Sequence, residues 1–580
     1  MESNKEEYYK LSEKELNSIN ELDKTFHKKE NYEFKFKLSN FLCDEKQLNN
    51  LVYRAGIVTS IFSMSKNGLP MGIMITGGNN NNSFNGIKIS SEKGEMLSNE
   101  EEEYFDNIIN SNNLKESINT LFLKLKPKQG KCIIVIGIDN RESSKKLSEI
   151  LIKGLKCIDN CSYNFYDIVP SPSLYFLTFV NQMTFQKIGL KYKMVFVPRD
   201  NYWAYLINSF NKFHSYYNIV FKNKQENKIN YENEICIDCS NGIASLYKNQ
   251  IMGIFNNKEN NYPLKLHLIN DNNNERELNI NCGINTILEK KLPKNKKEKC
   301  ASIVKCATLS TDLDSIIYYI DKGDLNEKSE IKIIRGEKII VLYAKMLDFL
   351  IDNFSKNLKI KYYEMIKMGI ITSKYSNGAF ISYCENNLKN YKMSLTKTGI
   401  SNIQKESKNF DISICYEYNG QGTIYISQDL STKFGKLSSL IETSKDSQII
   451  ELFQLFVALF NSITSDGVSN LLVIESIMKL MNLSLQDVYD FYNEIPYKIS
   501  DIKMKCNNKF IIDEDDIKIL EPKNIQKIID EITNKYQKSK IYVRPTGTED
   551  CLRVYVESET DDSCVKIIEE LSKSLNEEKI

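Results

Sequence analysis

The sequence Cys132-Ile-Ile-Val-Ile-Gly-Ile-Asp139 decides the fold class when it is read together with the stretch that follows it. Its continuous apolar run ends in an aspartate, which is typical of a strand buried on both faces. The next stretch, Ser143–Leu155, has an apolar residue at every third or fourth position and predicts an amphipathic helix. A strand followed directly by a helix is the repeating unit of α/β proteins with parallel sheets.

The same alternation of strands and helices recurs along the chain. Further apolar runs predict strands at Met71–Thr76, Ile235–Asp238, Ile339–Leu342, Ile412–Tyr416 and Ile541–Arg544. Further stretches of helical period predict helices at Glu337–Phe354 and Ile449–Phe460. The chain has 580 residues, and at about 150 residues a domain it is expected to fold into about four domains. The apolar periodicity of residues 446–492 predicts a helical connector before the last domain.

Composition excludes several classes of partner. Lys and Arg total 77 and Asp and Glu total 76, so the net charge is +1, and we expect a small-molecule ligand rather than nucleic acid or a membrane. No apolar run reaches the ~18 residues of a membrane span, and Met1–Glu7 lacks the apolar core of a secretory signal. We therefore expect a cytoplasmic protein, whose oligomeric state the sequence leaves open.

The cysteines and a lysine-rich run carry no separate function in this interpretation. The chain has 14 cysteines, and the one CxxC pair, Cys236 and Cys239, lacks a second pair at zinc-finger spacing. We expect buried, reduced thiols. The run Lys290–Lys299 is expected to be a solvated loop.

One stretch, Arg544-Pro-Thr-Gly-Thr-Glu-Asp-Cys-Leu-Arg-Val-Tyr555, has the composition of a phosphate-binding turn. Gly547 lets backbone N–H groups approach a ligand, and the Thr546 and Thr548 hydroxyls on either side of it can donate hydrogen bonds. Arg544 and Arg553 supply guanidinium groups that match phosphate oxygens. The alternative is a plain surface turn, but so many phosphate donors at this spacing favour the binding site.

Four loops are candidates for the ligand site, because ligands of open α/β sheets bind outside the carboxyl ends of the strands. They follow Met71–Thr76, precede Ile316–Tyr319, interrupt Ile412–Thr423 and follow Ile541–Val543. Taken together, they resemble the corresponding loops of the phosphohexomutases, and within these the phosphoacetylglucosamine mutases. The resemblance extends from about Leu51 to about Glu557 in the right order.

The phosphate turn matches the Arg-Pro-Ser-Gly-Thr-Glu-Asp pattern of that family, with Thr546 keeping the serine's hydroxyl. Shorter matches to the family lie at Asn85–Lys88, Asp238–Ile243, Asn281–Gly283, Ser376–Gly378, Thr396–Gly399 and Leu472–Glu475. The resemblance implies an α/β fold with three similar mixed-sheet domains and a smaller C-terminal α+β domain. The boundaries predicted on this basis are 30–185, 186–305, 306–445, the helical connector 446–492, and the phosphate-binding domain 493–580.

The loop Glu417-Tyr-Asn-Gly-Gln-Gly422 resembles the sugar-binding loop of the acetylglucosamine enzymes. Those enzymes have Glu-Ala-Asn-Gly-His-Gly there, whereas glucose and mannose mutases have Glu-x-Ser-Gly-His. Asn419 therefore selects the subgroup, and its amide can donate and accept toward an acetamido group while Glu417 accepts from sugar hydroxyls. Gly420, Thr398 and Gly399 complete the sugar-binding residues that the resemblance implies.

The family's catalytic loop is degenerate in this chain. A Thr-Ala-Ser-His-Asn-Pro loop carries the phosphorylated serine in the family, and the matching stretch here is Thr76-Gly-Gly-Asn-Asn-Asn81. Gly78 occupies the nucleophile position and has no oxygen to phosphorylate, so no catalytic residue is intact. Thr76 and Ser83 are the nearest hydroxyls in sequence, and Ser83 is expected to be an ordinary loop serine.

The metal loop and the N-terminal motif also depart from the family. Its Asp-Gly-Asp-Ala-Asp-Arg reads Ser310-Thr-Asp-Leu-Asp-Ser315 here, so Asp312 and Asp314 remain and Ser310 is a weak third ligand. Mg²⁺ prefers octahedral oxygen ligation, and a weakened Mg²⁺ site is predicted at these residues. The family's N-terminal Tyr-Gly-Thr-Ala-Gly-Phe-Arg motif is hardly recognisable around Tyr32–Lys37.

The resemblance implies interconversion of N-acetylglucosamine 6-phosphate and 1-phosphate through a sugar 1,6-bisphosphate, a step toward UDP-N-acetylglucosamine. Loss of the nucleophile leaves other hypotheses open. The chain is either a divergent mutase that uses a bisphosphate directly or another hydroxyl, or a non-catalytic protein that binds sugar phosphates. A mutase for unmodified hexose phosphates is a third hypothesis, which Asn419 disfavours.

Overall fold

The computed structural model describes most of the chain. The described residues are 8–28, 34, 40–188, 196–221, 230–255, 262, 264–272, 275–323, 331–441, 443–503, 510–513, 517–536, 538–545 and 551–577. They divide into two compact units, which are described separately. Unit 1 comprises Met1–Ile334, Asn419–Thr423 and Gln448–Leu485, and unit 2 comprises Arg335–Tyr418, Ile424–Ser447 and Gln486–Ile580.

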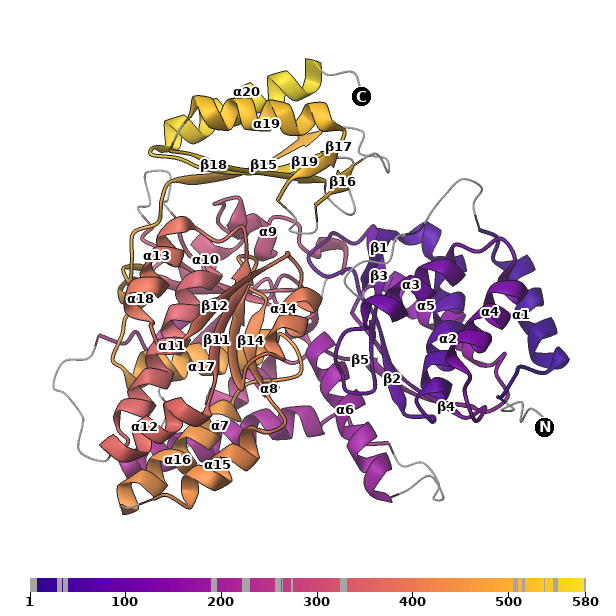
Figure 1. Ribbon diagram of the computed structural model, residues 1–580, viewed down its shortest axis with the longest axis horizontal. Coiled ribbons are helices and arrows are strands. Elements are labelled where there is room, and N and C mark those ends of the chain that lie inside the picture. The colour runs from indigo at the N-terminus through magenta and orange to yellow at the C-terminus, as the bar shows by residue number, and fades with distance from the viewer. Residues whose placement is uncertain are drawn as a thin grey trace, which may run out of the picture. The chain divides into compact units, whose positions relative to one another are not determined.

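Unit 1 contains two five-stranded sheets and the helices that cover them (Figure 1). Its elements are α1 (Glu13–Thr25), β1 (Asn40–Asp44), α2 (Leu48–Ser65), β2 (Pro70–Ile75), β3 (Phe84–Ser90), α3 (Asn99–Ile109), α4 (Leu114–Leu125), β4 (Cys132–Ile138), α5 (Glu142–Leu155), β5 (Cys161–Ile168), α6 (Ser171–Ile188), α7 (Asn201–Val220), β6 (Glu234–Asp238), α8 (Lys248–Phe255), β7 (Lys265–Ile269), α9 (Gly283–Leu288), α10 (Lys296–Cys300), β8 (Lys305–Leu309), β9 (Ile316–Asp321), β10 (Ile331–Ile334) and α17 (Gly467–Leu480). Most of α16 (Ser444–Val457) also belongs to it.

Both sheets of unit 1 have the same arrangement of strand directions. The first has the order β1-β3-β2-β4-β5, in which β2, β4 and β5 are parallel and β3 runs antiparallel to β1 and β2. The second has the order β10-β9-β8-β6-β7, in which β8, β6 and β7 are parallel and β9 runs antiparallel to β8 and β10. The hairpin β2–β3 of the first sheet therefore corresponds to the hairpin β8–β9 of the second.

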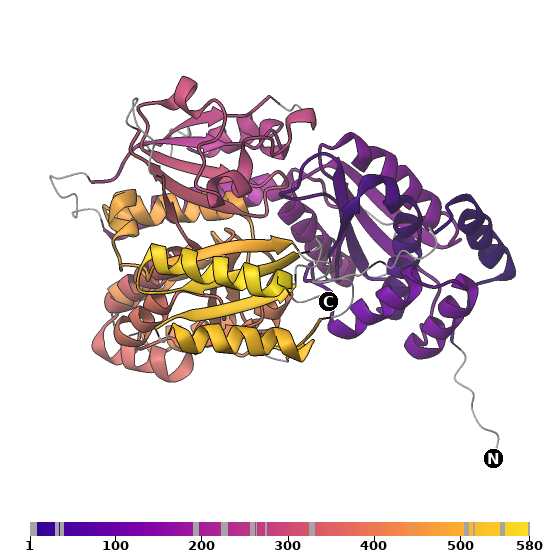
Figure 2. The same cartoon turned by 90° about the horizontal axis from the view of Figure 1, so that it is seen from above.

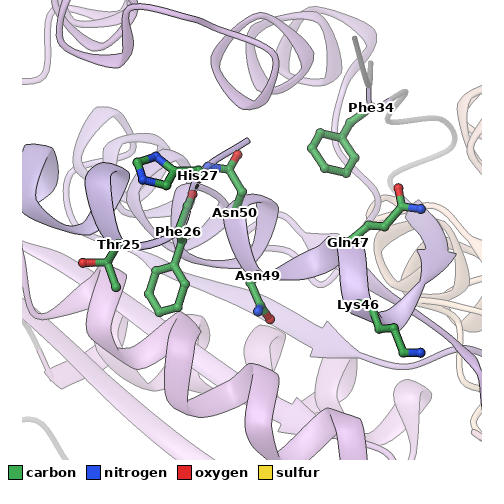
Figure 3. A pocket seen from close by; sticks show the side chains of 8 residues that line it. All are labelled: Thr25, Phe26, His27, Phe34, Lys46, Gln47, Asn49 and Asn50. Atoms are coloured by element: carbon green, nitrogen blue, oxygen red, sulfur yellow. Dashed lines mark hydrogen bonds between the residues drawn. The ribbon is translucent and has the colours of Figure 1, made fainter. Parts of the chain in front are cut away.

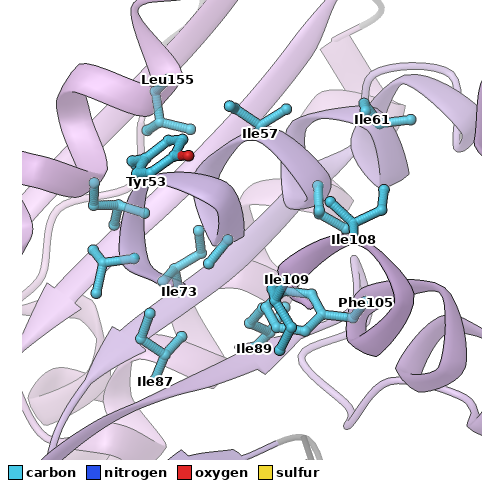
Figure 4. Packing of buried hydrophobic residues seen from close by; sticks show 14 of the residues in the cluster. Tyr53, Ile57, Ile61, Ile73, Ile87, Ile89, Phe105, Ile108, Ile109 and Leu155 are labelled. Carbon is cyan, nitrogen blue, oxygen red and sulfur yellow. The ribbon is translucent and has the colours of Figure 1, made fainter. Parts of the chain in front are cut away.

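The core of the first sheet forms because its central strands are buried at every position. Strands β2 and β4 have no exposed residue, so their sequences are continuous apolar runs. Helix α2 packs on this sheet and on α3, bringing together Tyr53, Ile57, Ile61, Ile73, Ile87, Ile89, Phe105, Ile108 and Ile109 (Figure 4). Burial of each such side chain contributes about 1.5–3 kcal/mol.

Helices α2 and α5 approach so closely that one contact requires glycine. A Cβ on Gly154 of α5 would lie 2.4 Å from the carbonyl oxygen of Tyr53 in α2. Any larger residue at position 154 would push the two helices apart. This contact fixes α5 beside the sheet, and α5 begins next to Arg141, a residue of the functional site described below.

Unit 2 contains the remaining sheets and helices. Its elements are α11 (Gly336–Asp352), α12 (Lys356–Met365), β11 (Met368–Ser373), α13 (Gly378–Asn387), β12 (Lys392–Thr396), α14 (Ile400–Ser407), β13 (Ile412–Tyr416), β14 (Gly422–Ile426), α15 (Leu430–Ser438), α18 (Leu485–Tyr489), β15 (Tyr497–Lys503), β16 (Ile511–Ile512), β17 (Ile519–Glu521), α19 (Lys523–Lys535), β18 (Lys540–Pro545), β19 (Cys551–Glu557) and α20 (Asp561–Glu577), of which β14 and α18 begin in unit 1.

One sheet has the order β12-β11-β13-β14, with β11 parallel to β12 and to β13. The C-terminal sheet, β15-β19-β18, is antiparallel, and α19 and α20 cover one of its faces (Figures 1 and 2). Strands β16 and β17 pair separately. Parallel sheets with helices, followed by an antiparallel sheet with helices on one face, confirm the predicted α/β class.

Most of the predicted elements are confirmed, and one is wrong. Five of the six predicted strands correspond to β2, β4, β6, β13 and β18, and the predicted helices correspond to α5, α11 and α16. The exception is Ile339–Leu342, which lies inside α11 because it belongs to a longer stretch of helical period. Residues 446–492 contain most of α16 together with α17 and α18.

The lysine-rich run is not simply a solvated loop, because it ends in α10. The Lys296 side chain is buried, and its Nζ donates to the carbonyl oxygens of Cys300 and Ile303 and lies 3.1 Å from Asp321. The expectation for the cysteines holds in the part of the chain that can be described, where they form no disulfide and all but Cys161 are buried.

The domain boundary predicted between residues 305 and 306 divides a sheet. It falls at the first residue of β8, and β9 pairs with β8, so the loop Ser310–Ser315 joins two strands of the second sheet. The prediction placed this loop in the third domain. It belongs instead to the second sheet, because the antiparallel hairpin extends the sheet already begun by β6. The other boundaries stay predictions. No helix of the described residues is long and apolar enough to cross a membrane.

Candidate functional site

The loop after β2 contains Gly78, the residue at the position predicted for the nucleophile. Its φ is +51°, in the left-handed region that glycine adopts without strain. A Cβ at Gly78 would have no heavy atom within 4 Å, so the space in front of this residue is open. The loop therefore has room for a side chain at this position and presents no side-chain oxygen there.

Donors from three other segments hold this loop by its carbonyl oxygens. Arg141 Nη2 donates to Gly78 O at 3.1 Å and to Asn80 O at 2.6 Å. Asn279 Nδ2 donates to the same two oxygens, at 3.2 and 2.8 Å, and Thr311 Oγ1 donates to Gly78 O at 2.5 Å. All these contacts are to backbone atoms, so the conformation of the loop does not depend on the side chain at position 78.

Arg141 is a buried member of this clamp. Its guanidinium is inaccessible to solvent and pairs with the buried carboxylate of Asp139, which also accepts a hydrogen bond from Ser144 Oγ at 2.5 Å. A Cβ on Gly77 would lie 2.7 Å from the guanidinium carbon. Glycine at 77 is therefore needed for the chain to pass over Arg141.

Both hydroxyls near Gly78 in sequence form hydrogen bonds within the loop. Thr76 is fully buried, and its Oγ1 accepts the N–H of Gly78 at 3.1 Å. Ser83 is exposed at the end of the loop, and its Oγ donates to Asn81 Oδ1 at 2.6 Å. The expectation that Ser83 is an ordinary loop serine agrees with this turn.

The loop after β8 carries the two aspartates predicted to bind metal, and Lys88 lies between them. Lys88 Nζ is 2.7 Å from Asp312 Oδ2 and 2.9 Å from Asp314 Oδ2. Lys88 belongs to β3, so the first sheet supplies the cation and the second supplies both carboxylates. The Lys88 side chain is 12 % exposed and that of Asp312 is inaccessible.

These charges support one another. Burial alone lowers the pKa of Lys88, but the two aspartates outweigh it and hold the pKa well above its ordinary value. Burial raises the pKa of Asp312, but the charge and hydrogen bond of Lys88 outweigh it, and the net pKa is lowered. At neutral pH the site therefore contains an ammonium and a carboxylate.

Few ligand atoms remain for a divalent cation. Asp314 Oδ1 accepts from Ser310 Oγ at 3.1 Å and from Ser315 Oγ at 3.0 Å. Of the four carboxylate oxygens, Asp312 Oδ1 alone lacks a hydrogen-bond partner among the described residues. The same residues contain no group of three His, Cys, Asp or Glu side chains able to hold a metal ion. The donor set does not fit Mg²⁺, and the Mg²⁺ site stays a prediction.

The part of the sugar loop that belongs to unit 1 packs against the aspartates. Gln421 Nε2 donates to Asp314 Oδ2 at 2.9 Å, and Asn419 Oδ1 accepts the N–H of Gln421 at 3.1 Å. The carbonyl oxygen of Gly420 accepts the N–H of Ile316, where β9 begins. Gln421, which replaces the family's histidine, thus bonds to the predicted metal loop.

Unit 2 brings several predicted ligand-binding residues together. Glu417 Oε1 accepts the N–H of Gly399 at 2.8 Å, and Arg544 Nη1 donates to Thr398 Oγ1. Arg544 comes from β18, about 150 residues beyond Thr398, so the fold places a predicted phosphate residue beside predicted sugar residues. Arg553, which is paired with Arg544 in the strand register, forms an ion pair with Asp501 at 2.9 Å. Thr546, Gly547 and Thr548 lie outside the described residues.

Sequence reasoning missed Lys88, Arg141 and Asn279. Lys88 falls within a family match but received no role, although a charged residue inside the mostly buried strand β3 was a usable signal. Arg141 follows the strand of the fold-deciding stretch, at the edge where ligands of α/β sheets bind. Asn279 gave no local signal, because its contact with Gly78 joins residues 201 positions apart.

A separate cavity of about 210 Å³ lies near the start of α2. Thr25, Phe26, His27, Phe34, Lys46, Gln47, Asn49 and Asn50 line it, and none of these was predicted to have a function (Figure 3). Asn50 donates to the carbonyl oxygen of Phe26 at 2.5 Å. We assign this cavity no role.

Comparison with known proteins agrees with this geometry. The sequence model of the family described as phosphoacetylglucosamine mutase AMG1, domain III, matches residues 335–483. The family model of phosphoglucomutase/phosphomannomutase, alpha/beta/alpha domain I, matches residues 106–185. A phosphoacetylglucosamine mutase of Candida albicans is 28% identical over 560 residues, covering 94% of this chain and 96% of the relative. The chain belongs to the phosphoacetylglucosamine mutase family.

Solved structures extend the likeness over nearly the whole chain. A crystal structure of an N-acetylglucosamine-phosphate mutase in its substrate complex superposes with a TM-score of 0.82 at 25% identity, covering 97% of this chain and 100% of that chain. An Aspergillus fumigatus N-acetylphosphoglucosamine mutase, solved with GlcNAc-6P and magnesium, has a TM-score of 0.80 at 22% identity, covering 98% and 99%. The fold of these solved mutases therefore extends over nearly the whole chain.

Proposed function

We propose that this chain binds N-acetylglucosamine 6-phosphate and N-acetylglucosamine 1-phosphate and interconverts them. The observation that carries the proposal is the contact of Arg544 with Thr398 beside the Glu417–Gly399 hydrogen bond. It unites a guanidinium suited to a phosphate with a carboxylate suited to sugar hydroxyls. Asn419 supports the acetylated sugar, because its amide can pair with both the N–H and the C=O of an acetamido group.

In this proposal the predicted phosphate-binding and sugar-binding residues have separate tasks. Arg544 and Arg553, with Thr546, Gly547 and Thr548, bind the phosphate that is not being transferred. Glu417, Asn419 and Gly420 orient the sugar, with Thr398 and Gly399.

The phosphoryl group needs an acceptor while the sugar bisphosphate turns over, and Gly78 cannot be that acceptor. Turnover therefore requires either another hydroxyl of the chain or direct use of an added sugar 1,6-bisphosphate. The donor set around Asp312 and Asp314 does not fit Mg²⁺, and no step is assigned to that ion.

A second candidate function is supported by Gly78 itself. The open space at this residue and the intact clamp on its carbonyl oxygen leave a folded loop without a nucleophile. A protein with such a loop can bind sugar phosphates without transferring the phosphoryl group. It would then act as a sensor or a scaffold.

A coupled assay of the full chain distinguishes these candidates. N-acetylglucosamine 6-phosphate and a catalytic amount of glucose 1,6-bisphosphate are supplied, with and without Mg²⁺, and formation of the 1-phosphate is followed beside calorimetric binding of the substrate. Arg544→Ala removes a charged donor and should weaken binding about tenfold to a hundredfold. Lys538→Ala, which removes an exposed cation of the same unit, is the control.

The outcomes are distinct. Turnover that Asp312→Ala abolishes would support the mutase and exclude the binding-only function. Binding without turnover, weakened by Arg544→Ala and unchanged by Lys538→Ala, would support the second candidate. Failure to bind either sugar phosphate would overturn both. Intact mass should reveal a phosphoryl adduct if another side chain is the acceptor.

A further inference from the structure

Lys88 occupies the place where the family resemblance puts a metal ion. Its Nζ lies 2.7 Å from Asp312 Oδ2 and 2.9 Å from Asp314 Oδ2, and the side chain is 12 % exposed. An ammonium at these distances from two carboxylates bridges them as a small cation would. Because this ammonium belongs to a side chain it cannot diffuse away, and β3 fixes the position of Lys88 through the register Ile73↔Ile89, Met74↔Lys88 and Ile75↔Ile87.

Donors other than Lys88 bind three of the four carboxylate oxygens of the two aspartates. Asp312 Oδ2 accepts from Ser171 Oγ at 2.6 Å in addition to Lys88. Asp314 Oδ2 accepts from Gln421 Nε2, and Asp314 Oδ1 accepts from the hydroxyls of Ser310 and Ser315. Asp314 thus receives four donors, and a cation bound to it would have to displace several of them. The one carboxylate oxygen without a described partner, Asp312 Oδ1, is a single ligand.

The charge of the site and the number of its free ligand atoms both disfavour Mg²⁺. Mg²⁺ takes six oxygen ligands in near-octahedral geometry and gives up its water reluctantly. Two carboxylates carry two negative charges, and the ammonium already offsets one of them. Ser310 stands where the family has a third aspartate, and its hydroxyl donates to Asp314 instead of contributing a further negative charge.

We infer that the ammonium of Lys88 is the resident cation of this site and that Asp312 and Asp314 bind no divalent ion in this chain. The inference concerns the site alone and does not depend on the proposed function. It implies that the charge of the site is independent of the Mg²⁺ concentration. It also connects two departures from the family, since the third aspartate is absent where the two that remain share one lysine.

A second bridging lysine in the same unit provides a matched control. Lys66 Nζ lies 2.6 Å from Glu92 Oε2 and 2.8 Å from Glu101 Oε1, and its side chain is 23 % exposed. Lys66→Met therefore frees two carboxylates and removes one ammonium, as Lys88→Met does. Any Mn²⁺ binding that both variants gain is a general effect of freed carboxylates.

The test is titration of the full chain with Mn²⁺, followed by the electron paramagnetic resonance signal of the free ion. Wild-type protein should bind no stoichiometric Mn²⁺ up to about 1 mM, and its melting temperature should be the same in EDTA and in Mg²⁺. Lys88→Met with Ser310→Asp has three carboxylates and no ammonium. It should bind one Mn²⁺ at least about tenfold more tightly than wild type or Lys66→Met.

Wild-type binding of one Mn²⁺ below about 0.1 mM, lost in Asp312→Asn, would overturn the inference. This measurement needs no Lys88 variant, so it stands even where Lys88→Met fails to fold. Equal Mn²⁺ affinity of the double variant and Lys66→Met would also overturn it, because the freed aspartates would then form no specific site. A melting temperature of Lys88→Met equal to that of wild type would show that Lys88 does not bridge the aspartates.

Discussion

The loop after β2 and the loop after β8 occupy the same position in two sheets with the same strand directions, but different parts of the chain hold them. Gly78 and Asn80 are held through their carbonyl oxygens by Arg141, Asn279 and Thr311. The loop after β8 is likewise held at carbonyl oxygens, for example by Ser465 Oγ at Asp314 O. It is held in addition through the carboxylates of its own aspartates, by Lys88 and several polar donors.

The difference teaches why one loop can lose its side-chain chemistry and keep its conformation. A clamp on backbone oxygens is indifferent to side chains, so a glycine at position 78 keeps every contact of the clamp. In the loop after β8, where the carbonyl oxygens of Asp312 and Asp314 also accept hydrogen bonds, the aspartate side chains add contacts of their own. Substitutions in the first loop should therefore change chemistry, and substitutions in the second should change stability.

The largest effect is expected when the missing hydroxyl is restored. Gly78→Ser places a hydroxyl in open space, at a backbone conformation that costs a non-glycine residue about 1–2 kcal/mol. If the rest of the site is competent, 1-phosphate formation should rise at least about a hundredfold, because a covalent acceptor supplies most of the rate enhancement where one is used. The coupled assay measures it.

Gly78→Ala is the matched control, because it has the same backbone strain and no hydroxyl. It should leave turnover at the wild-type level. Equal rates for the serine and alanine variants would mean that the loop after β2 has lost more than its nucleophile, and the comparison of the two loops would then fail.

The next largest effect is on stability, in the loop after β8. Asp312→Asn leaves the Lys88 ammonium with one carboxylate in a buried site, and breaking a buried ion pair costs about 3–5 kcal/mol. The chain has one tryptophan, Trp203, which is buried in α7 of unit 1. Urea unfolding followed by its fluorescence reports on the unit that contains both loops.

Ser83→Ala, at the exposed end of the loop after β2, is the control for this measurement. It should change the stability of unit 1 by no more than about 0.5 kcal/mol. If Asp312→Asn were as mild as Ser83→Ala, the carboxylates would not be what holds the second loop.

The clamp itself gives a smaller effect. Asn279→Ala removes the amide that donates to Gly78 O and Asn80 O, and a buried acceptor that loses a donor costs about 1–3 kcal/mol. The loss should be local, seen as faster hydrogen exchange of the amides of residues 77–84. Asn386→Ala, which removes an exposed side-chain hydrogen bond in unit 2, should leave that exchange unchanged.

The sequence was sufficient to predict the α/β class and most strands, because buried parallel strands such as Cys132–Ile138 are continuous apolar runs. Ile339–Leu342 shows where this signal fails, because four apolar residues within a helical period look like a strand. The aspartates and Gly78 were found because their positions within loops match a pattern. Lys88 and Asn279 act on loops from other segments, and such contacts are visible only after folding.

The smallest effect separates both loops from the rest of unit 1 by pH. His214 of α7 is buried beside Lys479 and Tyr262, and its Nε2 lies 2.8 Å from Ser476 Oγ. Burial, with a smaller contribution from Lys479, lowers its pKa to about 3. Between that value and the ordinary pKa of about 6.5, the unfolded chain binds a proton that the folded chain does not, so stability falls as pH falls. The free energy of unfolding of unit 1 should fall by about 1 kcal/mol between about pH 7 and pH 5.5.

His214→Gln should remove this pH dependence, and His267→Gln, at a half-buried position of β7, should keep it. Asp312→Asn should lower the Trp203 unfolding curves at both pH values by the same amount, because the Asp312 pKa is already below its ordinary value. A pH dependence that disappears in Asp312→Asn and persists in His214→Gln would place the acid sensitivity in the loop after β8, contrary to this assignment.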